Sequence, residues 1–453
     1  MLINLQCNNS KIQMKIYVAG LLMLGISCTI SAQTGSPTKD TIRLSLRDAW
    51  QKAEENSRHI RINTINVDIA EAEVKDAKRE RLPEIEVKGS AEKASNIPIY
   101  ENGIFSKPTQ HEVIHTLYRA GADFYLNIYN GNKLNLKIKE NQTLQKIKDI
   151  QKEQSVSDIH YKTAALYLEL QKTLIFRDLI KQDIADQKTQ LKEIQALFKN
   201  GVVLKSDVLR IELELSKRKM ALVTIENDIL IAMQKLNIIL GIPDEQTVIP
   251  EAPLNQWNEN TTYNEYLKLA LDHSFDYHVS EQQTALSIIK LKQVKANVRP
   301  KIGMYGEFYY ANPQIFLYPY NPYWYSLGIV GIKASFSISS LYHNTQKVKA
   351  AQLEFEKEEE VHKDTEDKVR QQVKEAYLRY QEAIEQIKVA EANVAQAKEN
   401  ARIIKNTYFS QTSLITELLD ADIQLLQTKF ELEAAKIMAQ NNYYLLQNIT
   451  GVL

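Results

Sequence analysis

The chain has 453 residues, of which 25% are charged and 44% hydrophobic, with 14 glycines and 11 prolines. This balance is typical of ordered protein rather than of a low-complexity tail. Its 56 basic and 56 acidic side chains give a formal net charge of zero. Because no broad basic field exists, the composition does not favour nucleic-acid binding, and we set that class of partner aside.

The first 32 residues have the pattern of a secretory signal peptide. Lys11 and Lys15 provide a basic start, the stretch 16–30 is apolar, and Ala32 closes a plausible cleavage site. Met14 is an alternative start, because the residues before it add polarity that such a signal does not need. The sequence therefore predicts an exported protein.

Two other fates of this N-terminal segment stay open. The apolar run would remain as an anchor if it were not cleaved, although it is shorter than the roughly 20 residues that span a bilayer. A lipid would be attached at Cys28 in a lipoprotein, although Gly25 stands where a lipidation motif has an aliphatic residue. Cleavage after Ala32 removes both cysteines, Cys7 and Cys28, and leaves 54 basic against 56 acidic side chains. The mature chain is then expected to contain no disulfide and no cysteine-bound metal.

A stretch of twelve residues occurs twice, 210 positions apart. The first copy runs over 198–209 and the second over 408–419. Each copy has an aromatic residue, a short polar turn, a leucine, a hydroxyl residue followed by an acid, and two aliphatic residues. Gly241 and Gly451 repeat at the same offset. Such self-similarity indicates that the chain consists of two related halves.

The similarity between the halves continues upstream, where the offset becomes 217. The sequence AEENS at 53–57 lies over ALDHS at 270–274, and Pro83 lies over Pro300. The segment between the halves is proline-rich, and we expect it to pack outside the helices with Trp257 as a core anchor. After the signal peptide over 1–32, the expected parts are a first repeat over 33–241, a linker over 242–261 and a second repeat over 262–453.

Each repeat is expected to hold a helix, a strand pair and a long helical hairpin. Helical spacing of apolar residues follows Ser45, and Pro83 ends it. From Glu84 the period changes to two, which predicts an antiparallel pair of strands. The elements expected in the first repeat are a helix over 45–81, strands over about 84–94 and 113–128, and a helical hairpin over 132–241.

The second repeat is expected to follow the same order. An aromatic loop that includes Tyr320, Tyr323 and Trp324 separates its two strands. Aromatic residues gather at bilayer interfaces, although a half-buried soluble sheet fits the alternation equally well. The elements expected in the second repeat are a helix over 262–298, strands over about 301–310 and 323–338, and a helical hairpin over 342–450.

The strands are the only segments expected to contact a bilayer. No apolar run of about 18 residues follows Ala32, which excludes a helical membrane protein. Four strands cannot close a barrel, and open sheet edges do not persist in lipid. If the strands lie in a membrane, several copies of the chain must build one barrel.

The long helices carry seams of apolar residues. The stretch 133–200 contains neither proline nor glycine, and it predicts a helix of roughly 100 Å. The stretch 343–410 matches it, with apolar residues in steps of four and three between Val369 and Tyr408. Such steps indicate coiled-coil packing. Two adjacent seams follow the second turn, which suits a cylinder of helices better than a two-stranded rod.

The duplicated order of helix, strand pair and hairpin, with the turn motif and Gly241 and Gly451, resembles the TolC family of bacterial outer-membrane efflux ducts. The resemblance covers 44–453. It implies a mainly α fold with membrane β structure, in which a trimer builds a 12-stranded β-barrel on a 12-helix α-barrel. The barrel would lie in the outer membrane, and the helices would cross the periplasm.

The same resemblance implies the passive exit duct of a tripartite efflux or secretion system. The duct would dock a periplasmic membrane-fusion adaptor at its helical tips, open by an iris-like movement of the helix pairs, and work with an inner-membrane pump of RND or ABC type. No enzyme activity, metal or cofactor is implied. The positions that match the docking tips are Asn200, Gly201, Val202, Val203, Leu204, Ser206, Thr412, Leu414 and Thr416.

Two acids after the second turn match the pore constriction of the family. Glu417 and Asp420 are three positions apart and therefore share one face of a helix. Three copies would place six carboxylates around a narrow mouth, which favours cations. The alternative is that both are solvated acids at a helix start, where the N-terminal dipole favours negative charge.

The family gate lock is matched only in part. Asp207 and Tyr408 stand at lock positions, but Ser413 occupies the place of the family arginine, and Gln411 replaces an expected glycine. In place of a salt bridge, we expect a weaker hydrogen bond that Tyr408 or Ser413 donates to Asp207.

A second hypothesis comes from a different class of protein. A soluble periplasmic coiled-coil adaptor or scaffold would also be exported and rich in long helices. An adaptor is expected to have one hairpin and a compact barrel or lipoyl-like domain, whereas this chain predicts two hairpins and paired sets of strands. The histidines show neither an HExxH motif nor metal-ligand spacing, so no metalloenzyme is indicated.

Overall fold

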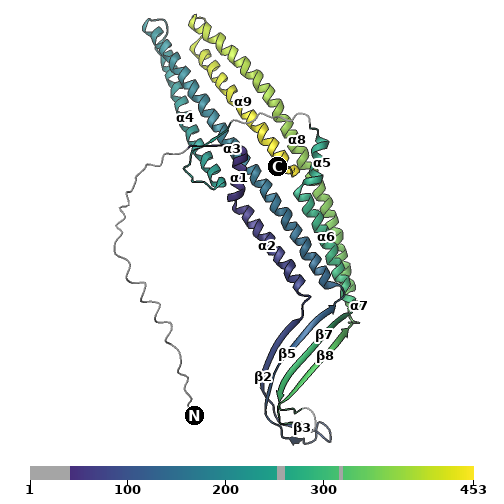
Figure 1. Ribbon diagram of the computed structural model, residues 1–453. Helices are drawn as coiled ribbons and strands as arrows, with labels where there is room; N and C mark the ends of the chain where they lie inside the picture. The colour runs from purple at the N-terminus through teal and green to yellow at the C-terminus, as the bar shows by residue number, and fades with distance from the viewer. Residues whose placement is uncertain (1–40, 252–260, 316–319) are drawn as a thin grey trace, which may run out of the picture. The chain divides into compact units, whose positions relative to one another are not determined.

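Two long helical hairpins and a four-stranded sheet make up most of the structure (Figure 1). The computed structural model describes residues 41–251, 261–315 and 320–453. The expected signal peptide and Trp257 lie outside these residues. Among the helices of the described ranges, none combines the length and the apolar character that crossing a bilayer requires.

The first half of the chain supplies two short helices, two long strands and one hairpin. Four short strands, of three residues each, accompany them. The bounds are β1 (Ile42–Leu44), α1 (Leu46–Asn56), α2 (Arg58–Arg79), β2 (Glu84–Lys93), β3 (Ile97–Ile99), β4 (Thr109–His111), β5 (Thr116–Tyr129), α3 (Lys133–Lys199), α4 (Lys205–Leu240) and β6 (Val248–Pro250).

The second half repeats this order with its own hairpin. The bounds are α5 (Tyr263–His273), α6 (Phe275–Lys295), the 3-10 helix η1 (Ala296–Val298), β7 (Lys301–Asn312), β8 (Tyr325–Ser335), α7 (Ser340–His343), α8 (Thr345–Phe409) and α9 (Ile415–Thr450). The two longest helices, α3 and α8, have 67 and 65 residues.

The first helix of each repeat is broken, in contrast to the single helices predicted over 45–81 and 262–298. The breaks fall at Ser57 and Ser274, whose backbones are extended. The Ser57 side chain accepts a hydrogen bond from the backbone N–H of Ile60, which caps the helix that follows. The prediction was wrong because the apolar spacing continues across each break.

The end of each hairpin packs against one of these breaks. Gly241 ends α4 with φ +68°, and a Cβ there would come within 2.6 Å of Asn56. The Asn56 side-chain amide donates to the carbonyl of Leu240 at 3.1 Å. In the second half, a Cβ on Gly451 would come within 2.2 Å of the carbonyl oxygen of His273. Both glycines are therefore required by close backbone approach as well as by a positive φ.

The long strands form one antiparallel sheet in the order β2-β5-β7-β8. A single row across it joins Ile85, Phe124, Gly306 and Val330. The strand pairs of the two halves therefore meet along β5 and β7. At the two sides, β2 and β8 have no further partner among the described strands. The bounds shift slightly from those predicted, since β5 begins at Thr116 and β8 ends at Ser335.

The linker is less irregular than predicted. Its segment β6 pairs in parallel with β1, with Val248 opposite Ile42. The Tyr167 hydroxyl of α3 donates to the carbonyl of Leu44 at 2.9 Å and to that of Glu251 at 3.2 Å. The linker is thereby fixed to the side of the first hairpin.

The helices are held together by several buried apolar clusters rather than by one core. One cluster lies where the ends of both hairpins meet, near the turns. Its buried members are Ile194, Val208, Ile211, Tyr408, Ile415, Leu418 and Leu419. A polar contact between the hairpins also joins α3 to α9, where Ser157 donates to Asn448 at 2.6 Å. The two repeats therefore share an interface along α3 and α9.

Candidate channel surfaces on the helical tips and the sheet

The first hairpin turn is closed by two backbone hydrogen bonds. Gly201 N–H donates to the carbonyl of Phe198, and Val202 N–H donates to that of Leu197, both at 2.9 Å. With φ +72° at Gly201, this is a Schellman motif. The turn is thus built by its own sequence and does not require a partner.

The second hairpin turn repeats the same geometry without a glycine. Gln411 N–H donates to the carbonyl of Tyr408, and Thr412 N–H donates to that of Thr407, both at 2.9 Å. Gln411 has φ +64°. This left-handed conformation is unfavourable for any residue other than glycine, because the Cβ atom comes too close to the backbone. The repeat that the sequence indicated is therefore also a repeat of backbone structure.

Each turn ends in an exposed leucine that precedes the next helix. Leu204 is 71% exposed and Leu414 is 68% exposed, at equivalent positions. Of the other positions expected to dock an adaptor, most are exposed and Val203 and Thr416 are half-buried; the exposed ones are Asn200, Gly201, Val202, Ser206 and Thr412. The two tips therefore present apolar side chains that this chain leaves uncovered.

Both candidate constriction acids are exposed at the start of α9. The Glu417 carboxylate accepts a hydrogen bond from the backbone N–H of Leu414 at 3.2 Å. Glu417 therefore caps its own helix, as the alternative interpretation expected, and it remains available to solvent. Asp420 lies one turn further along, on the same side.

The hydrogen bond expected from Tyr408 or Ser413 to Asp207 is not formed in this chain. The Tyr408 hydroxyl is buried and has no hydrogen-bond partner among the described residues. Ser413 bonds instead to the hydroxyl of Thr407 at 2.6 Å, and Asp207 accepts from Ser206 at 3.3 Å. In the single chain, the hydroxyl of Ser413 and the carboxylate of Asp207 have local partners, so the gate lock stays a prediction about the assembled protein.

Tyr408 nevertheless lies near Asp207. Burial, and then the charge of Asp207, raise the pKa of Tyr408 to about 12. The phenol is therefore a neutral donor at physiological pH.

A buried polar seam below the tips was not predicted. Arg218 of α4 donates to Asp183 of α3 at 2.7 Å, and both side chains are largely buried. Gln187 of α3 donates to Asp422 of α9 at 3.4 Å, which joins the first hairpin to the second. Burial raises the pKa of both Asp183 and Asp422. The one signal in the sequence is that Arg218 interrupts an apolar stripe.

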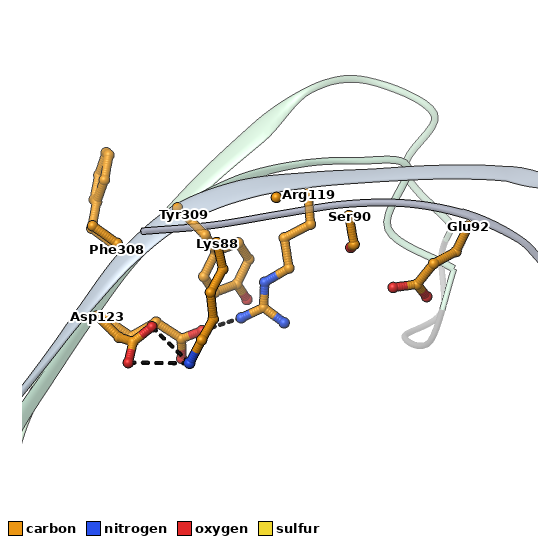
Figure 2. A pocket seen from close by; sticks show the side chains of 11 residues that line it. Lys88, Ser90, Glu92, Arg119, Asp123, Phe308 and Tyr309 are labelled. Carbon is orange, nitrogen blue, oxygen red and sulfur yellow. Dashed lines mark hydrogen bonds and ion pairs between the residues drawn. The ribbon is translucent and has the colours of Figure 1, made fainter. Parts of the chain in front are cut away.

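One face of the sheet is charged. Lys88 forms ion pairs with Asp123 at 3.1 Å and with Glu86 at 2.9 Å. Arg119 pairs with Glu307, and its guanidinium lies 3.9 Å above the ring of Tyr309. Figure 2 shows Lys88, Arg119 and Asp123 on the same side of the strands. This face is hollowed and polar, as the wall of an aqueous passage would be.

The opposite face of the sheet is apolar and exposed. Phe308 points to this side, away from the charged residues (Figure 2). Val87 is 81% exposed and Ile332 is 72% exposed, with Ile85 and Val330 similarly open. A soluble protein rarely leaves such a continuous apolar patch uncovered. An ordinary half-buried soluble sheet is therefore not what the structure shows.

A sheet with one apolar and one charged face, carried on two long helical hairpins, defines an outer-membrane channel protein. Residues 49–242 and 266–452 match the family described as outer membrane efflux protein, and the chain belongs to this family. The resemblance to TolC-like ducts is confirmed. The protein is an outer-membrane efflux protein, and its family consists of channels rather than enzymes.

Solved structures share the fold at low sequence identity. The chain is similar to CusC (TM-score 0.77, 13% identity, covering 90% of this chain and 92% of that one). It is similar to VceC from Vibrio cholerae (TM-score 0.73, 14% identity, covering 90% of this chain and 96% of that one). It is also similar to CmeC from Campylobacter jejuni (TM-score 0.70, 13% identity, covering 90% of this chain and 85% of that one). No curated protein matches the sequence significantly.

Proposed function

We propose that three copies of this chain form the exit duct of a tripartite efflux or secretion system. The observation that carries the proposal is the sheet, which exposes an apolar face and ends at two unpaired strands. Three copies of a four-stranded sheet supply twelve strands, and closing them into one barrel pairs every edge. The apolar face would then meet lipid, and the charged face would line the passage.

The helices support the same assembly. On α4, large apolar side chains that are exposed in the single chain recur at spacings close to those of a coiled-coil seam. They are Leu209, Leu213, Met220, Val223, Leu230 and Ile238. A neighbouring copy packed along this stripe would cover it and continue the helical cylinder.

The tips are the proposed docking surface for a periplasmic membrane-fusion adaptor, with an inner-membrane pump of RND or ABC type beyond it. The exposed Leu204 and Leu414 support this role, because apolar side chains at a convex tip have no partner within the chain. Replacing both with aspartate should abolish adaptor binding and leave the channel intact. Replacing both with methionine is the matched control, and it should preserve binding.

The closed gate, in this proposal, adds contacts that the single chain does not make. Glu417 and Asp420 of three copies would meet at the mouth, and the Tyr408 hydroxyl would donate to the Asp207 carboxylate. The nearness of these last two groups and the unpaired hydroxyl support that step. Iris-like movement of the helix pairs would break the contact and open the duct.

Purified protein in detergent and in planar bilayers tests the assembly. The proposal expects the mass of three chains by native mass spectrometry and discrete single-channel conductance. A monomer that does not conduct would overturn it.

A further inference from the structure

Basic residues are concentrated where the helices meet the sheet. Four stretches of chain at this level hold thirteen Lys or Arg residues and only two Asp or Glu residues. The whole chain has equal numbers of both, so the concentration does not follow from composition. We call these stretches the basic collar; they are 78–83, 132–140, 290–301 and 335–349.

Hydrogen bonds tie the four stretches into one structural level. Arg81 after α2 donates to Asn135 of α3 at 2.9 Å, and Arg299 after η1 donates to the carbonyl of Gly131 at 3.2 Å. Asn344, just before α8, donates at 2.8 Å to a backbone carbonyl near the end of α6. Figure 1 shows these ends gathered where the helices pass into the strands. The basic residues therefore lie at one level of the molecule.

Much of this charge is free to meet a partner. Lys78, Arg79, Lys292 and Lys295 are exposed, and none of them forms an ion pair within the described ranges. Lys137, by contrast, is paired with Glu80. An acidic partner from outside the chain would find these cations unneutralised.

The collar borders the apolar face of the sheet. Large apolar side chains are exposed at Ile128 near the end of β5 and at Phe336, Ile338 and Tyr342, which lie between the end of β8 and the basic residues of the last collar stretch. An apolar band followed by tyrosine and then by long cationic side chains is the order found at a bilayer surface. The acyl chains would contact the band, and the collar would lie at the depth of the headgroups.

We propose that the basic collar binds the anionic headgroups of phospholipids in the leaflet that borders the helices. This inference rests on the placement of the sheet in a membrane proposed above. An anionic leaflet attracts clustered basic residues next to a membrane-spanning segment. Bound headgroups would also relieve the repulsion among the cations of neighbouring copies and fix the depth of the barrel in the bilayer.

The test uses full-length protein in phosphatidylcholine vesicles that carry a trace of spin-labelled lipid. The motionally restricted fraction is compared for labelled phosphatidylglycerol and labelled phosphatidylcholine. Wild type should prefer phosphatidylglycerol by about fivefold at low salt, and the preference should shrink at high salt. Excess inorganic phosphate should not remove this lipid preference, because a free ion lacks the acyl chains. If added phosphate abolished the preference, the site would be one for free phosphate, and the proposal would be overturned.

Two variants make the test specific. Replacing Lys78, Arg79, Lys292 and Lys295 with glutamine should reduce the preference at least about threefold. The matched control replaces four exposed lysines of the hairpins, Lys192, Lys219, Lys235 and Lys398, with glutamine, and it should behave as wild type. Conductance is recorded for every sample. If the channels conduct but show no preference for phosphatidylglycerol, or if both variants lose it equally, lipid binding by the collar is overturned and the proposed function is not. If the protein neither inserts nor conducts, the proposed function is overturned, and lipid binding by the collar with it.

Discussion

At the scale of single residues, the two hairpin turns differ in one important position. Gly201 and Gln411 occupy the same place in equivalent Schellman motifs, and both have positive φ. A side chain in this conformation costs about 1 kcal/mol relative to glycine. The second tip is therefore the less stable of the two, although its hydrogen bonds are equivalent.

Gln411→Gly should stabilise the second turn by about 1 kcal/mol. Amide hydrogen exchange of 410–414 measures the local free energy of opening. Gly201→Gln is the reciprocal control and should destabilise the first turn by a similar amount, because no heavy atom lies within 4 Å of a Cβ built there. Unchanged exchange in both variants would contradict this account of the turns.

Tyr408→Phe should raise the open probability of the reconstituted channel roughly tenfold, because it removes the donor of a proposed charge-assisted hydrogen bond. Single-channel recording in planar bilayers provides the measurement. Ser413→Ala should have no effect, since its hydroxyl bonds to Thr407. If Tyr408→Phe gates as wild type does, the contact with Asp207 is not part of the lock.

At the scale of elements, the buried seam below the tips makes the packing of α9 on α3 depend on pH. Asp422 of α9 is half-buried, and burial raises its pKa above the ordinary value of 3.8. The folded state therefore binds this proton more tightly than the unfolded state does. The free energy of unfolding should rise as the pH falls through the raised pKa of the folded state. The rise should end near pH 3.8, the ordinary pKa, below which the unfolded state is protonated as well.

Asp422→Asn should stabilise the protein by about 1 kcal/mol at pH 8, because it removes a partly buried negative charge. It should also reduce the rise in melting temperature between pH 8 and pH 5. Asp420→Asn, on the exposed side of the same helix, should retain the wild-type pH dependence. A variant at 422 with an unchanged pH profile would show that this carboxylate does not control the seam.

The elements also show how far the sequence predicts the fold. The hairpins and the alternating strands are local patterns, and their positions follow from the spacing of residues such as Leu418 and Val330. The breaks at Ser57 and Ser274 were not predicted, because the apolar spacing continues across them; the contacts that each break makes with Gly241 or Gly451 come from the distant end of a hairpin. The sequence contained both features as repeats, but only the structure brings them into contact.

Some parts of the candidate site could likewise be predicted from local sequence, and others could not. The positions of the two turns were predicted because adjacent residues specify each turn, as Phe198 to Leu204 do in the first hairpin. The seam of Asp183, Arg218 and Asp422 was missed, because it joins three helices whose mutual packing no local pattern specifies. The expected bond to Asp207 stays a prediction, although the local bond between Ser413 and Thr407 was not foreseen.

At the scale of the whole molecule, the acids of the second tip are predicted to act together only in the assembled duct. Glu417→Gln combined with Asp420→Asn should lower the preference for potassium over chloride at least about twofold. Glutamine can still accept the hydrogen bond from Leu414, so the helix cap is retained. Reversal potentials in a potassium chloride gradient measure the effect.

Glu245→Gln in the linker is the control for this experiment. It removes one exposed carboxylate without changing the tips. The linker variant should retain the wild-type reversal potential. Equal changes in both variants would mean that ion preference reflects the overall charge of the protein rather than a ring at its mouth.

The assembly itself depends on which strands meet at the edges of the sheet. Within one chain, β2 and β8 are separated by β5 and β7. Adjacent strands are about 4.8 Å apart, so these edges are roughly 14 Å apart and too distant for a disulfide. A disulfide between them can therefore form only between copies.

Disulfide cross-linking between the two edges tests the central claim most directly. One cysteine replaces Glu86 in β2, and a second is placed in turn at positions 327, 329, 331 and 333 of β8. Three copies closed into one barrel predict that at least one pair yields a covalent band of three chains and no larger ladder on a denaturing gel. Chains that stay single for every pair, in protein that is folded and inserted, would contradict the trimeric duct.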